Sequence, residues 1–363
     1  MTSTLGRYFG LRFLTTLVAV LAGVFGLIVL IDYVEMMRRH ADVPNVSALL
    51  VAKTSLFRVP QIAERILPFC VLIGAMSCYL GLSRRLELVV SRAAGISAWQ
   101  FIAPALIVAL VIGGLATALY NPVAAVLHER SKRLEAEMSG NARNAGLQAT
   151  ANGFWVRQRS VDGYSIVNAS TSREQGVILG SVSAFVFDRG GNFRERIEAK
   201  SAALKAGHWE LNDAVIYRPG TPPSEHARYD LPTNLTPEQV RETLSTPETV
   251  PFWQLPHFIE MADRAGLTAT GYRLQYHKLI ARPFMLAAMV LLAAAFSLRF
   301  FRFGGVQKMV LAGIGSGFLL YVLSKVIDDV STAEMLNPVV AAWLPVLIGG
   351  MTGFVVLLYQ EDG

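Results

Sequence analysis

The stretch FLTTLVAVLAGVFGLIVLI, residues 13–31, decides the fold class of this chain. It contains no Lys, Arg, Asp or Glu. An α-helix rises about 1.5 Å per residue, so a helix of this length matches the roughly 30 Å hydrocarbon core of a bilayer. We expect these residues to cross a membrane as one helix.

Five more apolar stretches follow, and a long polar block separates the first three from the last three. The five are residues 66–82, 99–126, 283–298, 309–324 and 337–359. The mean hydropathy of +0.41 and the charged fraction of 17% agree with a membrane protein, because soluble domains carry about 25% charged residues. The sequence predicts a polytopic α-helical membrane protein with six transmembrane helices, arranged three plus three around one inserted domain.

The basic residues near the ends of these stretches predict the orientation of the chain. One side carries eight bases, at Arg7, Arg12, Arg84, Arg85, Arg92, Arg299, Arg302 and Lys308. The other side carries four, at Arg38, Arg39, Lys53 and Arg58. Since the more basic side faces the cytoplasm, we expect both termini in the cytoplasm and the inserted domain outside. Arg38 and Arg39 oppose this rule and therefore need another explanation.

The inserted block changes from helical to strand periodicity. Six short runs are predicted as strands, at residues 154–157, 164–167, 177–188, 197–204, 208–217 and 227–231. Turn residues such as Asp162-Gly163, Ala206-Gly207 and Pro219-Gly220 separate them. Strands about ten residues apart with no helices between them predict an antiparallel, sandwich or jelly-roll-like β domain.

Three shorter helices complete the prediction. Apolar residues recur at helical spacing from Val46 to Phe57, which predicts an interfacial helix. Residues 84–94 predict a short helix across the cytoplasmic face that ends at Gly95. Residues 252–265 predict an amphipathic helix. The resulting division is 1–137 for helices one to three with the cytoplasmic helix at 83–96, 138–250 for the β domain, and 251–363 for the connecting helix and helices four to six.

No motif in the chain carries bond-making chemistry. There is no nucleotide-binding G-x-x-x-x-G-K-[ST] sequence, and His128-Glu129 lacks the second histidine of a zinc protease. Cys70 and Cys78 are eight residues apart on one predicted helix, about 12 Å along its axis, which is too far for a disulfide. We expect no enzymatic activity, no metal site and no nucleic-acid binding.

Several segments resemble one family in the same order along the chain. LSRRLELVVSRAAGIS at residues 82–97 resembles the coupling-helix signature of the LptF/LptG permeases, the YjgP/YjgQ family of lipopolysaccharide export. The other matching segments are LPFCVLIGAMSCYLGL at 67–82, Asn121-Pro122, NLTP at 234–237 and YRLQYHKLIARPF at 272–284. The ending, GFLLYVLSKVIDD at 317–329 and LNPVVAAWLPVLIGG at 336–350, resembles the LptG branch more than the LptF branch.

This resemblance implies a place in an ABC exporter of the bacterial inner membrane. In such an exporter the LptF and LptG permeases pair with a dimer of the ATPase LptB, which binds the ATP and Mg, so this chain itself needs no cofactor. The resemblance also implies LptC and a periplasmic LptA bridge as partners and places the β domain in the periplasm. The alternative functional classes are a secondary transporter and a membrane-anchored scaffold for the β domain.

The resemblance also implies three groups of site residues. Glu87 is the expected contact with the ATPase, surrounded by Arg84, Leu86, Val90 and Arg92. The alternative is that Glu87 pairs with Arg84 on its own helix. Lipopolysaccharide phosphates are expected to meet bases at the outer ends of helices one and three, with apolar walls for the acyl chains; the residues are Arg38, Arg39, His40, Arg130, Lys132, Arg133, Phe25 and Ile28. The alternative for the bases is that they anchor the helices at the membrane surface.

Asp32 departs from the family pattern, which often has a base just inside the first span. A carboxylate there repels phosphate, so we expect Asp32 to pair with a neighbouring base. In the β domain the expected acyl-chain path is lined by Phe154, Val156, Ile166, Phe185 and Phe187, with an ordinary hydrophobic core as the alternative.

Overall fold

The computed structural model describes residues 4–41, 47–138, 154–160, 163–173, 176–188, 190–233, 247–264, 268–299 and 306–361. Six helices in these ranges are long and apolar enough to cross a membrane. They are α1 (Thr4–Arg39), α2 (Ala48–Arg84), α4 (Ala98–Leu115) continued by α5 (Asn121–Met138), α8 (Thr270–Arg299), α9 (Val306–Thr332) and α10 (Pro338–Glu361). The predicted three-plus-three arrangement is confirmed.

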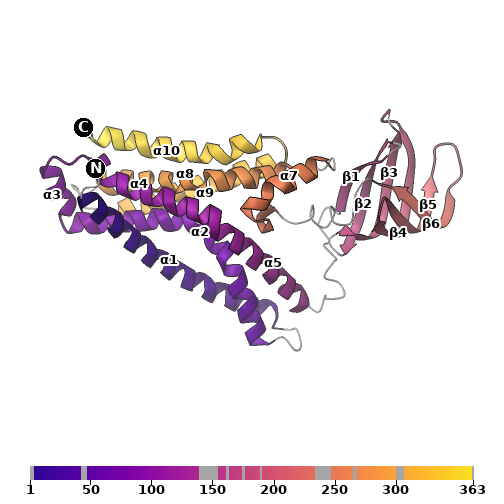
Figure 1. Cartoon of the computed structure of the whole chain (residues 1–363), viewed down its shortest axis with the longest axis horizontal. Coiled ribbons are helices and arrows are strands. Elements are labelled where there is room, and N and C mark those ends of the chain that lie inside the picture. The colour runs from indigo at the N-terminus through magenta and orange to yellow at the C-terminus, as the bar shows by residue number, and fades with distance from the viewer. Residues whose placement is uncertain are drawn as a thin grey trace.

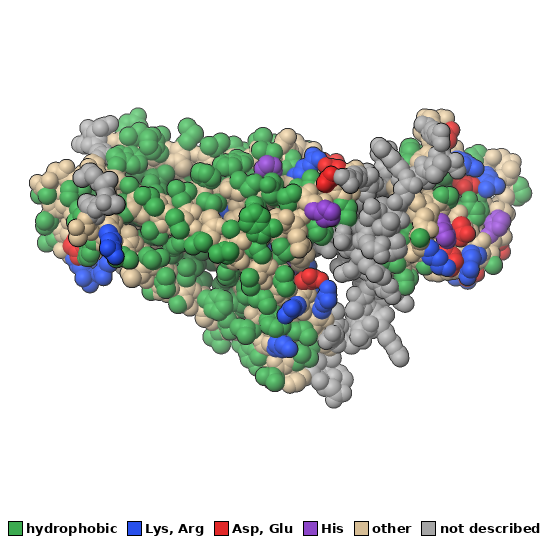
Figure 2. All heavy atoms as spheres, viewed as in Figure 1, with side chains coloured by type: hydrophobic (Ala, Val, Ile, Leu, Met, Phe, Trp, Pro, Cys, Tyr) green, Lys and Arg blue, Asp and Glu red, His purple; other side chains and the backbone are tan. Residues whose placement is uncertain are grey.

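Both termini lie at the same end of the helices as the short helix α3 (Glu87–Ala93), and the β domain lies beyond the opposite end (Figure 1). Charged side chains gather at the two ends of the helical part and on the β domain, while the surface between them is apolar (Figure 2). Leu30, Val111 and Leu319 are among the large apolar side chains exposed on this surface. Such a belt fits contact with lipid tails.

The second helix is longer than the sequence predicted. The segment expected as a separate interfacial helix is the first part of α2, which continues without a break through Pro60 and Pro68. Ser47 caps its start, where the Ser47 Oγ accepts a hydrogen bond from the Leu49 N–H at 3.3 Å. The prediction of an independent interfacial helix is therefore wrong, because this helical pattern continues directly into that of the span.

The core of the helical part lies where α1, α2, α4 and α8 meet. Its buried side chains include Phe13, Leu72, Phe101 and Val290. A Cβ at Gly113 would lie 2.4 Å from Pro283 Cα, so α4 and α8 pack at a distance that only glycine permits. Small residues allow such close approach between membrane helices.

The short helix α3 begins three residues later than predicted. Leu86 has a positive φ of 63°, which separates α2 from α3. The predicted end at Gly95 is confirmed: Gly95 has φ of 80°, and the Ile96 N–H donates to the Ser91 carbonyl at 3.1 Å. This bond closes a Schellman motif, which needs a left-handed residue at that position.

The inserted block is a β domain, as predicted. Its strands are β1 (Phe154–Ser160), β2 (Gly163–Arg173), β3 (Ile178–Asp188), β4 (Phe193–Lys205), β5 (His208–Tyr217) and β6 (Ser224–Pro232). They form one antiparallel sheet in sequence order. Its buried side chains form a core on one face of the sheet, around Val182, Ile197, Trp209 and Leu211.

A row of irregularities crosses this sheet. The ladders between neighbouring strands skip Ser181, Lys200 and Asp213, and both Ser181 and Asp213 have φ of 51°. Beyond this row the buried positions change from odd to even numbers, as from Leu211 to Ala214. Irregularities of this kind bend a strand. Because they stand side by side, the sheet curls around its core while the apolar side chains stay on one face.

The chain returns to the membrane through two short 3₁₀ turns, Pro247–Thr249 and Phe252–Gln254, and then helix α7 (Leu255–Arg264). The predicted amphipathic helix is confirmed, with its first turn in 3₁₀ form. We refer to residues 247–254 as the return linker.

Candidate functional site

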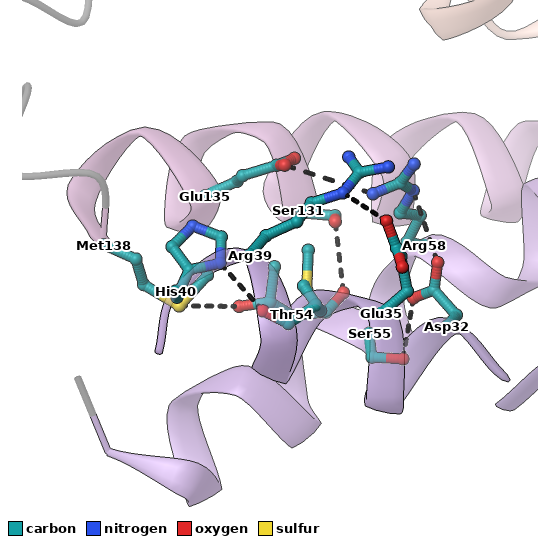
Figure 3. A network of polar contacts seen from close by, with 11 residues as sticks. Asp32, Glu35, Arg39, His40, Thr54, Ser55, Arg58, Ser131, Glu135 and Met138 are labelled. Carbon is teal, nitrogen blue, oxygen red and sulfur yellow. Dashed lines mark hydrogen bonds and ion pairs between the residues drawn. The ribbon is translucent and has the colours of Figure 1, made fainter. Parts of the chain in front are cut away.

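The first candidate site lies where the outer ends of α1, α2 and α5 meet (Figure 3). Arg38 and Arg39 occupy the last turn of α1. Positive charge in this position is stabilised by the carbonyl end of a helix. Both side chains are more than half exposed, 77% and 52% respectively, so they can reach a ligand at the membrane surface.

Glu35 binds both arginines, which sequence reasoning missed. Arg38 Nη2 lies 2.8 Å from Glu35 Oε2, and Arg39 Nε lies 2.9 Å from Glu35 Oε1. The spacing of three and four residues on a predicted helix was the available signal. A guanidinium has five N–H donors, so these pairs leave donor capacity for a phosphate group.

Asp32 pairs with a base, as expected. Its Oδ1 lies 3.6 Å from Arg58 Nε, and its Oδ2 accepts a hydrogen bond from Ser55 Oγ at 2.7 Å. Arg58 Nη1 is also 4.0 Å from Glu135 of α5 (Figure 3). Arg58 therefore links α1, α2 and α5 and neutralises the carboxylate that departs from the family pattern.

Two residues proposed for lipid contact are buried instead. His40 is 8% exposed, and its Nδ1 lies 3.0 Å from the Met36 carbonyl. The imidazole ring thus contacts a carbonyl in the last turns of α1. Ile28 is 9% exposed and packs inside the protein, whereas Phe25 is 38% exposed. We therefore remove His40 and Ile28 from the candidate site and keep Phe25, because only an accessible side chain can meet a lipid.

The bases of α5 differ in their surroundings. Arg133 forms an ion pair with Glu129 one turn earlier, while Arg130 and Lys132 are exposed at the surface. Among the described side chains, this region together with the ends of α1 and α2 holds seven bases and four carboxylates: Arg38, Arg39, Lys53, Arg58, Arg130, Lys132 and Arg133 against Asp32, Glu35, Glu129 and Glu135. The balance favours an anionic ligand.

The second candidate site is α3, at the other end of the helices. Leu86 and Val90 are 55% and 67% exposed, and Arg84 is exposed beside them. Glu87 accepts a hydrogen bond from Tyr8 Oη of α1 at 3.0 Å, so its observed contact is with Tyr8 instead of Arg84. The side chain of Arg92 lies outside the described residues. Exposed apolar side chains around a carboxylate are suited to docking another protein.

Three of the five candidate acyl-chain residues of the β domain lie on the face opposite its core. Ile166 and Phe185 are paired across β2 and β3, and their neighbours Val167 and Ala184 are buried in the core. Since side chains alternate along a strand, Ile166, Phe185 and Phe187 point to the opposite face. The side chains of Phe154 and Val156 lie outside the described residues. An acyl chain inside the domain would instead meet the face that carries Val167 and Ala184.

A polar cavity of about 540 Å³ between α2, α8, α9 and α10 was not predicted. Four ion pairs surround it: Glu64 with Arg282, Arg65 with Glu248, Lys278 with Asp328, and Lys325 with Asp329. Charged residues inside membrane spans are unfavourable unless paired and usually have a function. The signal that could have found it was the position of Glu64 and Arg282, each just before the start of an apolar stretch.

Within the described ranges, no three His, Cys, Asp or Glu side chains are placed to hold a metal ion. Cys70 and Cys78 are both buried and unbonded to each other, as their spacing predicted.

The protein-family model for the lipopolysaccharide export system permeases LptF/LptG matches residues 7–359 of the chain. The chain belongs to the LptF/LptG family. The chain is 25% identical to the LptG permease of Escherichia coli K12 over 348 residues, which is 94% of each protein. It is 24% identical to LptG of Haemophilus influenzae over 371 residues, 99% of this chain and 98% of the relative. The predicted resemblance to LptG is confirmed.

In this LptF/LptG permease the two candidate sites lie at opposite ends of the same helices. α1 connects them directly, because it carries Tyr8 beside Glu87 at one end and Arg38 and Arg39 at the other. The cavity surrounded by ion pairs lies in the half of the helical part nearer the β domain, where α2 and α8 meet the return linker.

Proposed function

We propose that this permease takes lipopolysaccharide from the outer leaflet of the bacterial inner membrane and passes it toward a periplasmic bridge. One observation carries the proposal: exposed Arg38 and Arg39 lie at the end of a helix whose sides are exposed and apolar. Lipid A combines phosphates with acyl chains. An amphiphile of this kind needs a base and an apolar wall next to each other.

The bases would hold the phosphates by charge-assisted hydrogen bonds, which arginine forms in bidentate geometry. Arg38, Arg39, Arg130 and Arg133 are the exposed arginines of this region. The acyl chains would lie along the exposed side of α1, at Phe25 and Leu27. Neighbouring Glu35 would limit how tightly the phosphates are held, which favours release.

The energy would come from a separate ATPase, the LptB dimer, with ATP and Mg bound there. α3 would dock on it through Glu87, Leu86 and Val90. Both termini and α3 would then lie in the cytoplasm and the β domain in the periplasm, in agreement with the distribution of bases. A second permease of the LptF type, LptC and the LptA bridge would complete the exporter. Closure of the ATPase would move α3, narrow the space between the two permeases that holds the lipid, and push the lipid outward.

The β domain would receive the acyl chains on its apolar inner face. The outermost described strands, β1 and β6, pair on one side only in the described sheet. An edge strand can add to a neighbouring β domain through main-chain hydrogen bonds. This would provide a continuous path into the next component.

The two alternatives receive less support. A secondary transporter needs a membrane carboxylate that exchanges ions. Glu64 is buried in the membrane region, but it is held by Arg282 and accepts a hydrogen bond from Asn121 at 2.8 Å. A scaffold for one β domain needs a single span, and the described part of this chain has six helices long and apolar enough to cross a membrane.

Purification of the chain from its native membrane in mild detergent tests the proposal. We expect an ATPase and a second six-span permease to copurify, and lipopolysaccharide to change the ATPase rate of the complex in nanodiscs. Isolation of the chain without an ATPase, or ATPase activity that is insensitive to lipopolysaccharide, contradicts the proposal.

A further inference from the structure

Three sequence segments shared with the family have no part in either candidate site. They are Asn121-Pro122, residues 272–284 and residues 317–329. In the structure their polar side chains meet around the cavity between α2, α8 and α9, beside the return linker. Asn121 lies at the centre of the contacts with this linker.

Asn121 is 2% exposed and uses both ends of its amide. Its Nδ2 donates to Glu64 Oε1 of α2 at 2.8 Å. Its Oδ1 accepts from the Phe252 N–H of the return linker at 2.9 Å. One side chain thus connects spans two and three to the segment that leads away from the β domain.

Glu64 carries this connection further. Its side chain is 5% exposed and forms an ion pair with Arg282 of α8, which is 16% exposed. Removing one partner of a buried ion pair leaves an uncompensated charge and is strongly destabilising, so the pair fixes α2 against α8. A shift of α2 therefore changes the position of the group that Asn121 binds.

The backbone of span three is adapted at the same place. Residues Ala116–Tyr120 form a π-helical turn just before Pro122. Because Pro122 has no N–H, it cannot donate to the Ala118 carbonyl as an α-helix requires. Trp253 Nε1 of the return linker donates to this carbonyl instead, at 3.0 Å. Turns of π-helix inside α-helices occur often at functional sites.

Three further contacts hold the return linker on α2 and α8. Glu248 accepts a hydrogen bond from Gln61 Nε2 at its carbonyl, 3.2 Å away, and its carboxylate pairs with Arg65. Phe252 stacks on Tyr276 with ring centres 5.5 Å apart and an interplanar angle of 10°. The linker is therefore attached to spans two, three and four at once.

We propose that Asn121 is a positioning residue that passes movement of α2 to the return linker and so to the β domain. This inference rests on the proposed function. α2 is one continuous helix from Ala48 to Arg84, directly before α3. A displacement of α3 by the ATPase moves the whole of α2, including Glu64. Asn121 follows Glu64 and carries Phe252 with it, because it is hydrogen-bonded to both.

The test compares Asn121→Leu with Thr117→Val in the complete complex in nanodiscs. Thr117 is a matched control: it is buried one turn earlier, and its Oγ1 donates to the Leu279 carbonyl at 2.8 Å, a bond between spans that does not involve the linker. Spin labels at exposed Lys200 of β4 and Val339 of α10 report the distance between the β domain and the membrane helices. ATP hydrolysis and lipopolysaccharide release are measured on the same samples.

We expect the wild type and Thr117→Val to show an ATP-dependent change in the label distance. Asn121→Leu should keep its ATPase rate, lose this change, and release about fivefold less lipopolysaccharide per ATP, the lower end of typical coupling. Loss of release without loss of hydrolysis is the result that a purely structural role would not give. If Asn121→Leu matches Thr117→Val in both distance and release, or if the wild type shows no distance change, the inference is overturned.

Trp253→Phe keeps the test decisive if Asn121→Leu fails to assemble. Trp253 is 66% exposed, so this change removes one hydrogen bond to Ala118 with little effect on folding. We expect Trp253→Phe to release less lipopolysaccharide per ATP at an unchanged ATPase rate, with a smaller loss than in Asn121→Leu. Wild-type release by Trp253→Phe would contradict the proposal. A wild-type complex that neither hydrolyses ATP nor releases lipopolysaccharide instead contradicts the proposed function.

Discussion

Arg39 lies one helical turn after Glu35, and its Nε donates to Glu35 Oε1 at 2.9 Å. The most exposed bases at the outer end of α1 are thus partly neutralised by their own helix. A phosphate that binds there competes with Glu35 for the same donors. The ion pair therefore sets how strongly the site can hold an anionic lipid.

Charge reversal of both arginines should weaken lipopolysaccharide binding. Each arginine can donate charge-assisted hydrogen bonds to a phosphate, whereas a glutamate in its place repels the phosphate. We therefore expect Arg38→Glu with Arg39→Glu to lower photocrosslinking of lipopolysaccharide by about tenfold or more. The control is Arg194→Glu with Lys200→Glu, two exposed bases of β4. Equal crosslinking in both double variants would return Arg38 and Arg39 to the role of surface anchors.

Removal of the competing carboxylate should have the opposite effect. Glu35→Gln frees donors of Arg38 and Arg39 without changing the length of the side chain by much. We expect stronger capture of lipopolysaccharide and slower release, measured by crosslinking yield and by a pulse-chase of labelled lipid. Glu198→Gln is a matched control, because Glu198 also pairs with an exposed arginine, Arg196, in β4 away from the candidate site. Weaker capture by Glu35→Gln would show that Glu35 positions the arginines productively.

Coupling to the ATPase should depend on Glu87 far more than on Tyr8. Glu87→Lys reverses the charge at the docking surface, so we expect loss of the copurifying ATPase. Tyr8→Phe removes one hydrogen bond at the protein surface and should leave the ATPase bound. Subunit ratios after purification measure both effects. Normal ratios and activity in Glu87→Lys would exclude α3 as the docking element.

A lipid path through the β domain should follow its inner face. Val186 is partly buried against the core, whereas the adjacent Phe185 points to the other face. We expect a photocrosslinker at position 186 to capture lipopolysaccharide in the presence of ATP, and one at position 185 to capture little. Capture at 185 alone would place the path on the outer face. Capture at neither position, with transport intact, would mean that the lipid bypasses this domain.

The β domain should lose stability in acid through Glu210. Its carboxylate accepts a hydrogen bond from Lys205 at 2.6 Å and lies 3.4 Å from Arg228 of β6, and these contacts lower its pKa. A carboxyl group with a lowered pKa stabilises the fold above its unfolded pKa, and this stability is lost as the pH falls through the folded pKa. The loss should therefore occur below about pH 4.

Hydrogen exchange of β5 and β6 in the full chain, corrected for the intrinsic exchange rate, measures this loss. Glu210→Gln should already be less protected at neutral pH and should change less on acidification. Glu225→Gln, an exposed carboxylate of β6 that is paired with Val215 of β5, serves as control. Identical pH profiles for Glu210→Gln and the wild type would contradict the assignment.

Sequence patterns were sufficient for the elements but not for every boundary. The six apolar stretches and the strand runs were found because hydrophobic periodicity is local, and Gly95 was recognised because a left-handed residue ends a helix. The first part of α2 was separated wrongly, since a pattern does not show whether two helices are continuous. The face that Ile166 and Phe185 occupy was also missed. The row of irregularities at Ser181, Lys200 and Asp213 shifts the alternation, and its effect depends on neighbouring strands.

The sequence by itself determined the membrane class, the three-plus-three order, the β insert and the residues that resemble the LptF/LptG family. These properties follow from composition and local spacing. Only the tertiary structure decided the partners of the charged and polar residues: Arg58 with Asp32, Arg282 with Glu64, and Asn121 with Phe252. Hydrogen bonds and ion pairs between distant segments depend on how the helices pack. Local patterns in one amino-acid sequence do not specify which polar side chains meet inside the membrane.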